Sequence, residues 1–141
     1  MFVDASAMVA IITEESGFET LIPQLDASSS SCVTSAIAIW ETAVRLTTKW
    51  GRAVPDASAT VEQFRVSMGI SLVEIGAEES RIALEAFDRF GKGRHPARLN
   101  MGDCFAYACA KAHRMPLIFV GNDFALTDVN KGFQVVATKM G

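Results

Sequence analysis

The sequence predicts an α/β fold in which helices cover both faces of one mainly parallel sheet. Short apolar segments alternate with longer segments of helical periodicity along the chain, and this order favours parallel strands joined by helices. The chain has 141 residues, 50% of them hydrophobic, which suits one domain with its own core. We expect a single domain over residues 1–141, because no internal repeat, low-complexity tract or domain boundary is evident.

Each expected element rests on local sequence. Five apolar segments are expected as strands, at 1–4, 32–34, 70–73, 117–120 and 134–137. Helices are expected at 6–14, 16–24, 55–68 and 78–90, and the glycine-rich residues 91–98 are expected to form a loop. Two further helices follow the N-cap candidates Ser35 and Asn100 and run to about Trp50 and Arg114.

Charge and composition exclude several classes of protein. The formal net charge is −3 and the pI is near 5.3, so any contact with nucleic acid needs a local basic patch. No apolar segment approaches the roughly 20 residues of a membrane helix, and Asp4 interrupts the N-terminal apolar stretch, so no secretory signal is expected. The three cysteines lack metal-ligand spacing, which fits a cytoplasmic protein.

Carboxylates in apolar surroundings are the main clue to chemistry. They are Asp4, Glu41, Asp103 and Asp123. An isolated carboxylate buried in such surroundings is costly or takes up a proton. No Lys or Arg is adjacent in sequence to any of them, so a shared divalent cation is the expected counter-charge. Carboxylate oxygens suit Mg²⁺ or Mn²⁺ rather than Zn²⁺, and such a site can activate water against a phosphodiester.

The positions of these acids predict that they meet. Asp4 ends the first expected strand and Asp123 follows the fourth, and parallel sheets bind ligands outside the carboxyl ends of their strands. Asp103 lies in the first turn of a helix, where free N–H groups favour an anion. Glu41 lies on the apolar side of the helix after the second strand. All of these side chains can therefore reach the same end of one sheet.

Each acid also has a purely structural explanation. Asp4 is an N-cap candidate for the first helix. Asp103, three residues after Asn100, matches a capping box in which Asp replaces Glu. Asp123 is a candidate turn residue after Gly121. A structural role is least applicable to Glu41, because a helix interior offers a carboxylate no free N–H.

The neighbours of the acids are basic or apolar. The basic residues from Arg45 to Arg52 recur along one helix and its exit, and we interpret them as a solvated face. Arg94 and Arg98 belong to the glycine-rich loop before the Asp103 helix, where phosphate binding is expected. Trp40 and the apolar residues of its helix are interpreted as core.

Four segments resemble, in order and spacing, the acidic motifs of the PIN-domain family, and in particular those of VapC-type toxin ribonucleases from bacterial toxin–antitoxin pairs. They are Phe2–Ala7, Thr34–Glu41, Leu99–Ala108 and Phe119–Asp128. The resemblance covers nearly the whole chain. It implies a three-layer α/β/α sandwich with a central mostly parallel sheet, dependence on Mg²⁺ or Mn²⁺, endonucleolytic cleavage of RNA, homodimers, and a small VapB-type antitoxin as partner.

The resemblance also implies roles for single residues. Asp4, Glu41 and Asp103 would bind metal and act in catalysis. Asp123 holds the fourth acidic position and would bind metal directly or through water, or shape the site. Many members carry an acid two residues earlier, where this chain has Gly121. The side chains expected to contact the RNA phosphate or water at the metal are Ser6, Ser35, Asn122, Arg94 and Arg98.

Other functions fit less well. A haloacid-dehalogenase-type phosphatase needs a second acid two residues after the first, where this chain has Ser6. A phospho-receiver needs an acceptor Asp at the end of a central strand, and the strand 70–73 is followed by Glu74. The alternative that stays open is a degenerate PIN domain that binds RNA or a protein without cleavage, because Gly121 replaces an acid.

Overall fold

The computed structural model describes residues 1–27, 32–121, 123–128 and 135–138 of the chain. Its strands are β1 (Phe2–Val3), β2 (Val33–Ser35), β3 (Ser71–Val73), β4 (Leu117–Val120) and β5 (Val135–Thr138). Its α-helices are α1 (Ala5–Ile12), α2 (Ile22–Ala27), α3 (Ala36–Trp50), α4 (Val54–Ser67), α5 (Ala77–Phe90) and α6 (Met101–Ala112). Short 3-10 helices are η1 (Phe18–Thr20) and η3 (Asp123–Leu126). Strands and helices therefore follow one another in the expected order, with two α-helices between each pair of successive strands from β1 to β4.

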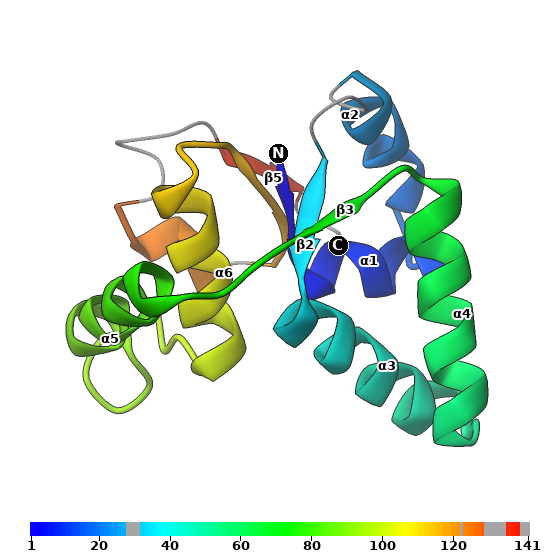
Figure 1. Ribbon diagram of the computed structural model, residues 1–141, viewed down its shortest axis with the longest axis horizontal. Helices are drawn as coiled ribbons and strands as arrows, with labels where there is room; N and C mark the ends of the chain where they lie inside the picture. Colours follow the sequence, from blue (N-terminus) through cyan, green and yellow to red (C-terminus); the bar gives the residue numbers. More distant parts are fainter. Residues whose placement is uncertain (28–31, 122, 129–134, 139–141) are drawn as a thin grey trace.

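The strands form a five-stranded sheet in the order β3-β2-β1-β4-β5, and every neighbouring pair is parallel. Helices α5 and α6 lie on one side of the sheet, and α1, α3 and α4 lie on the other (Figure 1). The expected three-layer α/β/α sandwich is confirmed. No helix among the described residues is long and apolar enough to cross a membrane.

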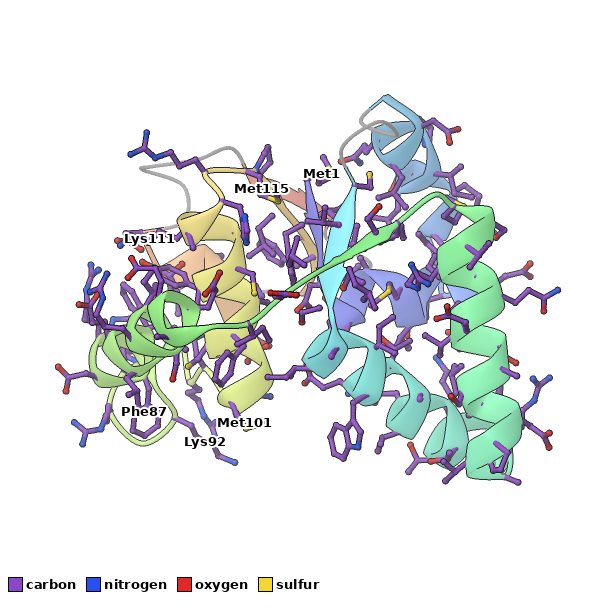
Figure 2. The ribbon with its side chains drawn as sticks, viewed as in Figure 1. Met1, Phe87, Lys92, Met101, Lys111 and Met115 are labelled. Atoms are coloured by element: carbon purple, nitrogen blue, oxygen red, sulfur yellow. The ribbon has the colours of Figure 1, made fainter. Side chains whose placement is uncertain are left out.

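The direction in which the sheet is built reverses beside β1. The chain adds β2 and β3 on one side of β1 and then returns to add β4 on the other side. Figure 2 shows Met1 and Met115, which precede β1 and β4, at one end of the sheet, and Met101, which opens α6, toward the other end. Open parallel sheets bind ligands at such a switch point, outside the carboxyl ends of the strands.

Helix α3 turns a narrower face to the core than its sequence suggested. Its buried residues are Ala38, Thr42 and Leu46, which recur every four positions. Trp40 lies two positions after Ala38, about 200° around the helix, and its side chain is 63% exposed. The interpretation of Trp40 as a core residue is therefore wrong. Val44, in the next turn, is also exposed.

The expected helix at 16–24 is divided in the structure. Gly17 has a left-handed φ of 87° and precedes η1. Pro23 then falls in the first turn of α2, where its missing N–H is not needed. The other element ends differ from expectation by a few residues. In the last strand, Gln134 lies outside the described residues, and Val135 begins β5.

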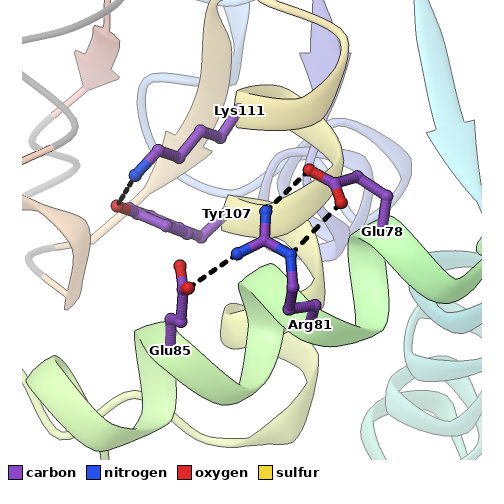
Figure 3. Close-up of polar contacts among 5 residues, drawn as sticks. All are labelled: Glu78, Arg81, Glu85, Tyr107 and Lys111. Carbon is purple, nitrogen blue, oxygen red and sulfur yellow. Dashed lines mark hydrogen bonds and ion pairs between the residues drawn. The ribbon is translucent and has the colours of Figure 1, made fainter.

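The segment after β4 is tied to α5 and α6 by polar contacts. The hydroxyl of Tyr107 donates to Oδ1 of Asp128 at 2.6 Å, and Nη1 of Arg89 donates to Oδ2 at 3.1 Å. Lys111 Nζ in turn donates to the Tyr107 hydroxyl at 3.4 Å, beside the exposed ion pairs of α5 (Figure 3). These bonds hold the short segment that begins with Asp123 in place.

Candidate active site

The structure brings the candidate acids together. Asp4, Glu41, Asp103 and Asp123 all line one cavity of about 180 Å³. They come from four places in the fold: the residue after β1, the second turn of α3, the first turn of α6, and the start of η3. Since these places are far apart in sequence, the meeting of the acids is a property of the sheet topology.

Asp4 is fixed by the start of α1. It is 5% exposed, and its Oδ2 accepts hydrogen bonds from the Ser6 N–H at 3.0 Å and the Ser6 hydroxyl at 2.5 Å. The Ser6 oxygen also accepts from the N–H of Val120 at 2.9 Å. The end of β4 is thereby joined to Asp4 through one serine. Asp4 is thus an N-cap, as its structural explanation expected, and it also lines the cavity.

Asp103 likewise takes part in capping a helix, α6, and lines the cavity. The Asn100 side chain accepts from the Asp103 N–H at 2.9 Å, and Oδ2 of Asp103 accepts from the Asn100 N–H at 3.1 Å. This reciprocal pair is the expected capping box. In the described part of the chain, Oδ1 of Asp103 accepts no hydrogen bond, so this oxygen remains available to a ligand.

Glu41 is held differently from the two aspartates. It lies inside α3 and accepts no hydrogen bond from any described residue. Its carboxylate lies directly against Gly102 in the first turn of α6. Arg45, one turn further along α3, lines the same cavity. Packing and charge, rather than backbone hydrogen bonds, therefore place the Glu41 carboxylate.

Asp123 is the exposed member of the set, whereas the other acids are buried or half-buried. The next residue, Phe124, is 2% exposed, and its ring lies 4.8 Å from that of Phe119 in β4, edge to face. This contact anchors the start of η3 beside the end of β4. Asp123 is near enough for its charge to act on Asp4 and on Asp103.

Burial and mutual repulsion raise the pKa of the three inner acids. For each, burial is the largest cause. The pKa of Asp4 is raised, and the pKa of Asp103 rises to about 7. The pKa of Glu41 also rises to about 7, through burial and then the charges of Asp4 and Asp103. The Arg45 charge opposes the rise at Glu41. Without a cation, the cavity therefore holds protons near neutral pH.

The donor chemistry of the cavity fits a hard divalent cation. Carboxylate oxygens are the ligands that Mg²⁺ and Mn²⁺ prefer, and a cation would offset the burial and the repulsion that raise these pKa values. No three His, Cys, Asp or Glu side chains of the described residues already form a metal-binding cluster.

The other side chains expected at the site have different positions. Ser6 lines the cavity. Ser35 does not: it is 1% exposed and caps α3. Arg94 and Arg98 also lie outside the cavity lining, and Arg94 forms an exposed ion pair with α5 at 3.3 Å. Asn122 lies outside the described residues. Contacts of these side chains with RNA remain predictions.

Arg45 is the functional candidate that the sequence interpretation placed on a solvated face. In the structure, its basic neighbours interact with other side chains, whereas Arg45 faces the cavity. Lys49 pairs with Glu15 at 3.1 Å, and Arg52 stacks on Trp50 at 4.5 Å. Arg45, exposed at the cavity, has no hydrogen bond or ion pair with any described residue. Its spacing of four from Glu41 is the sequence signal that identifies it, because such residues share a helix face.

The raised pKa of Asp103 predicts how pH acts on stability. In metal-free protein, Asp103→Asn should stabilise the fold. The gain should be small below the ordinary pKa of 3.8, grow as pH rises, and level off above about 7. The sign follows because the folded state binds a proton more tightly than the unfolded state, so the wild type loses stability over this range. Thermal melts in EDTA across this pH range measure the difference.

Asp56→Asn, an exposed change in the first turn of α4, is the control and should not reproduce the gain. If Asp103→Asn lowers the melting temperature at neutral pH without metal, the acid is primarily structural.

Comparisons with known proteins identify the family. The PIN domain family model matches residues 1–130. Ribonuclease VapC36 of Mycobacterium tuberculosis is 41% identical over 129 residues, which cover 92% of this chain and 91% of that protein. The VapC ribonuclease R02377 of Rhizobium meliloti is 40% identical over 139 residues, which cover 91% of this chain and 98% of that protein. In fold, the chain is similar to the crystal structure of Mycobacterium tuberculosis VapC20, a Sarcin-Ricin loop cleaving toxin, with a TM-score of 0.65 and 20% identity. This match covers 88% of the present chain and 92% of VapC20.

All four acids that line the cavity fall within the residues that the family model matches. The relatives cover most of this chain and most of their own length. The resemblance of the four acidic segments is therefore confirmed over the whole matched range. The chain belongs to the PIN-domain family and, within it, to the VapC type.

Proposed function

We propose that this protein is an endoribonuclease toxin of the VapC type that cleaves RNA phosphodiester bonds with Mg²⁺ or Mn²⁺. The relatives that cover most of the chain are named ribonucleases. One observation carries the proposal: carboxylates from four separate elements line one cavity at the switch point of a parallel sheet. That arrangement suits a cation and a phosphodiester.

The chain's own residues divide the work at this site. Asp4 and Asp103 are rigid, because each gives one oxygen to a helix start, and they would hold the cation. When bound, the cation would offset the carboxylates and the charge that develops on the phosphoryl oxygens. Glu41 accepts no hydrogen bond from the described residues, so its carboxylate would help to hold the cation and could also accept a proton from the attacking water. Ser6 keeps Asp4 in position.

Arg45 would bind the phosphate of the RNA. It is the basic side chain in the cavity lining, and a guanidinium matches phosphate oxygens with two parallel hydrogen bonds. Because the net charge of the protein is −3, a polyanionic substrate needs a positively charged side chain such as this one at the site. Arg45 would thus orient the scissile phosphate against the acids.

A non-cleaving PIN domain is the alternative function. One observation favours it: Gly121, which replaces an acid at the end of β4, has a φ of 107° and offers no side chain to the site. The exposed position of Asp123 also makes it a weaker ligand than an acid at the strand end. The intact Asp4, Glu41 and Asp103 favour cleavage.

Partners of two kinds belong to the proposal. A small VapB-type antitoxin would neutralise the enzyme, and the chain would form homodimers. The acidic cavity is suited to an antitoxin arginine, which would pair with carboxylates as Arg45 pairs with phosphate. Such an arginine would compete with the cation for the same oxygens.

Neutral substitutions of the acids test the catalytic proposal. Asp4→Asn, Glu41→Gln and Asp103→Asn should each lower RNA cleavage by about 100-fold or more, because each removes a charge that holds the cation. Asn keeps the cap oxygens of the two aspartates, so the fold should survive. Asp123→Asn should lower cleavage less and raise the Mg²⁺ concentration for half-maximal rate. Initial rates on a labelled RNA, with titrated Mg²⁺, measure both effects.

Metal removal is the control for this series. Wild-type protein in excess EDTA should not cleave, and added Mg²⁺ or Mn²⁺ should restore the rate. Cleavage that persists in EDTA and in the Asp103→Asn variant would show a contaminating nuclease or a different mechanism. Metal-dependent binding of RNA without any cleavage by the wild type would favour the alternative function.

The proposed role of Arg45 predicts weaker substrate binding without weaker metal binding. Arg45→Ala should raise the KM for RNA by about 10-fold, the loss of roughly one good phosphate contact, with no rise in the Mg²⁺ requirement, because a positive side chain does not bind the cation. Lys49→Ala is the matched control on the same helix, because Lys49 pairs with Glu15. Steady-state kinetics at several salt concentrations distinguish them. If the two substitutions change the KM for RNA equally, Arg45 does not bind the substrate and belongs to a solvated helix face.

The antitoxin proposal predicts competition. A peptide from the cognate antitoxin that carries an arginine should inhibit cleavage, and inhibition should weaken as Mg²⁺ rises. An alanine-for-arginine version of the peptide is the control and should lose the Mg²⁺ dependence. If both peptides inhibit equally at every Mg²⁺ concentration, the antitoxin acts away from the acidic cavity.

A further inference from the structure

The second residue of α6, Gly102, lies directly against the side chain of Glu41. Gly102 is buried. A Cβ placed on it would overlap both carboxylate oxygens and the Cδ of Glu41. Helices α3 and α6 therefore meet at a point where one helix contributes only backbone and the other contributes a carboxylate.

The backbone itself does not require glycine at this position. Gly102 is absent from the left-handed glycines of the described chain and forms part of regular helix α6. In a helix, glycine is less favourable than alanine, because it loses more conformational freedom on folding. The reason for glycine here is thus the space that Glu41 occupies.

We propose that Gly102 is a positioning residue for the Glu41 carboxylate. By lacking a side chain, it allows Glu41 to lie beside the first turn of α6 and next to Asp103, so that the two acids reach the cavity together. The effect on metal binding rests on the proposed function, whereas the steric coupling between Gly102 and Glu41 does not.

The first turn of α6 would then organise two acids at once. Its capping box fixes Asp103 through Asn100, and its glycine leaves room for Glu41. Any side chain at Gly102 would push the flexible end of Glu41 away while the helix stays in place. The expected result is a folded protein whose cation site is incomplete.

Metal binding by the isolated protein is the first test. Mn²⁺ titrations by calorimetry should show about 10-fold or greater loss of affinity in Gly102→Ala, the size expected when a ligand loses its support. Gly76→Ala is the matched control. Gly76 also begins a helix beside a glutamate, but a Cβ there would lie 3.6 Å from Glu79 Oε2, an ordinary contact. Its Mn²⁺ affinity should stay that of the wild type.

A double-mutant cycle without metal is the second test. Gly102→Ala should raise the melting temperature of Glu41→Ala, because the overlap is gone and alanine favours the helix. In the wild type the rise should be smaller, because the Glu41 side chain must move to make room. Circular dichroism confirms that each variant folds. An equal shift in both backgrounds would overturn the proposal, since the two residues would then act independently.

The two tests fail in different ways. If the wild type binds no Mn²⁺, the proposed function is wrong, and the cycle alone decides on Gly102. If the wild type binds Mn²⁺ and Gly102→Ala binds it equally well, the positioning role is wrong while the metal site stands.

Discussion

The burial of several carboxylates in one small cavity is the constraint around which this structure is arranged, and repulsion among them adds to its cost. Asp4 and Asp103 limit the cost by binding the free N–H groups at the starts of α1 and α6. Glu41 has no such bonds and depends on packing against Gly102 and on the Arg45 charge. The cost of burial and repulsion that these contacts do not offset raises the pKa values of Glu41 and Asp103. In the proposed function, a bound cation would offset this cost.

The same bonds serve folding and chemistry. Asp4 caps α1 and, through Ser6, is linked to the end of β4. Asp103 caps α6 with Asn100. Because each carboxylate has two oxygens, one can stabilise a helix start while the other faces the cavity. The structural and functional explanations of these acids are therefore compatible, and a rigid cap gives a ligand the fixed position that a catalytic site needs.

Much of the fold and of the acid set was predictable because local rules agree with the tertiary structure there. The N-caps Ser35 and Asn100 follow from residue type and spacing. Trp40 was mispredicted because an apolar residue in a helix indicates burial only if its face meets the core, and the core face of α3 is narrow. Arg45 was missed although its spacing of four from Glu41 places the two on one helix face. Gly102 was missed because its importance depends on what lies across from it, which no local pattern encodes.

The sequence by itself determined the order of strands and helices, the helix starts, and the identity of the acids, because short-range hydrogen bonding and periodicity decide these. The sequence also indicated that Asp4 and Asp123 reach the same end of the sheet, but only the tertiary structure, with β1 between β2 and β4, brings them into one cavity. The tertiary structure also decided which basic residue faces the acids, and why α6 carries glycine at position 102. Such features depend on packing between segments far apart in the chain, where contact and exclusion act only after the sheet has formed.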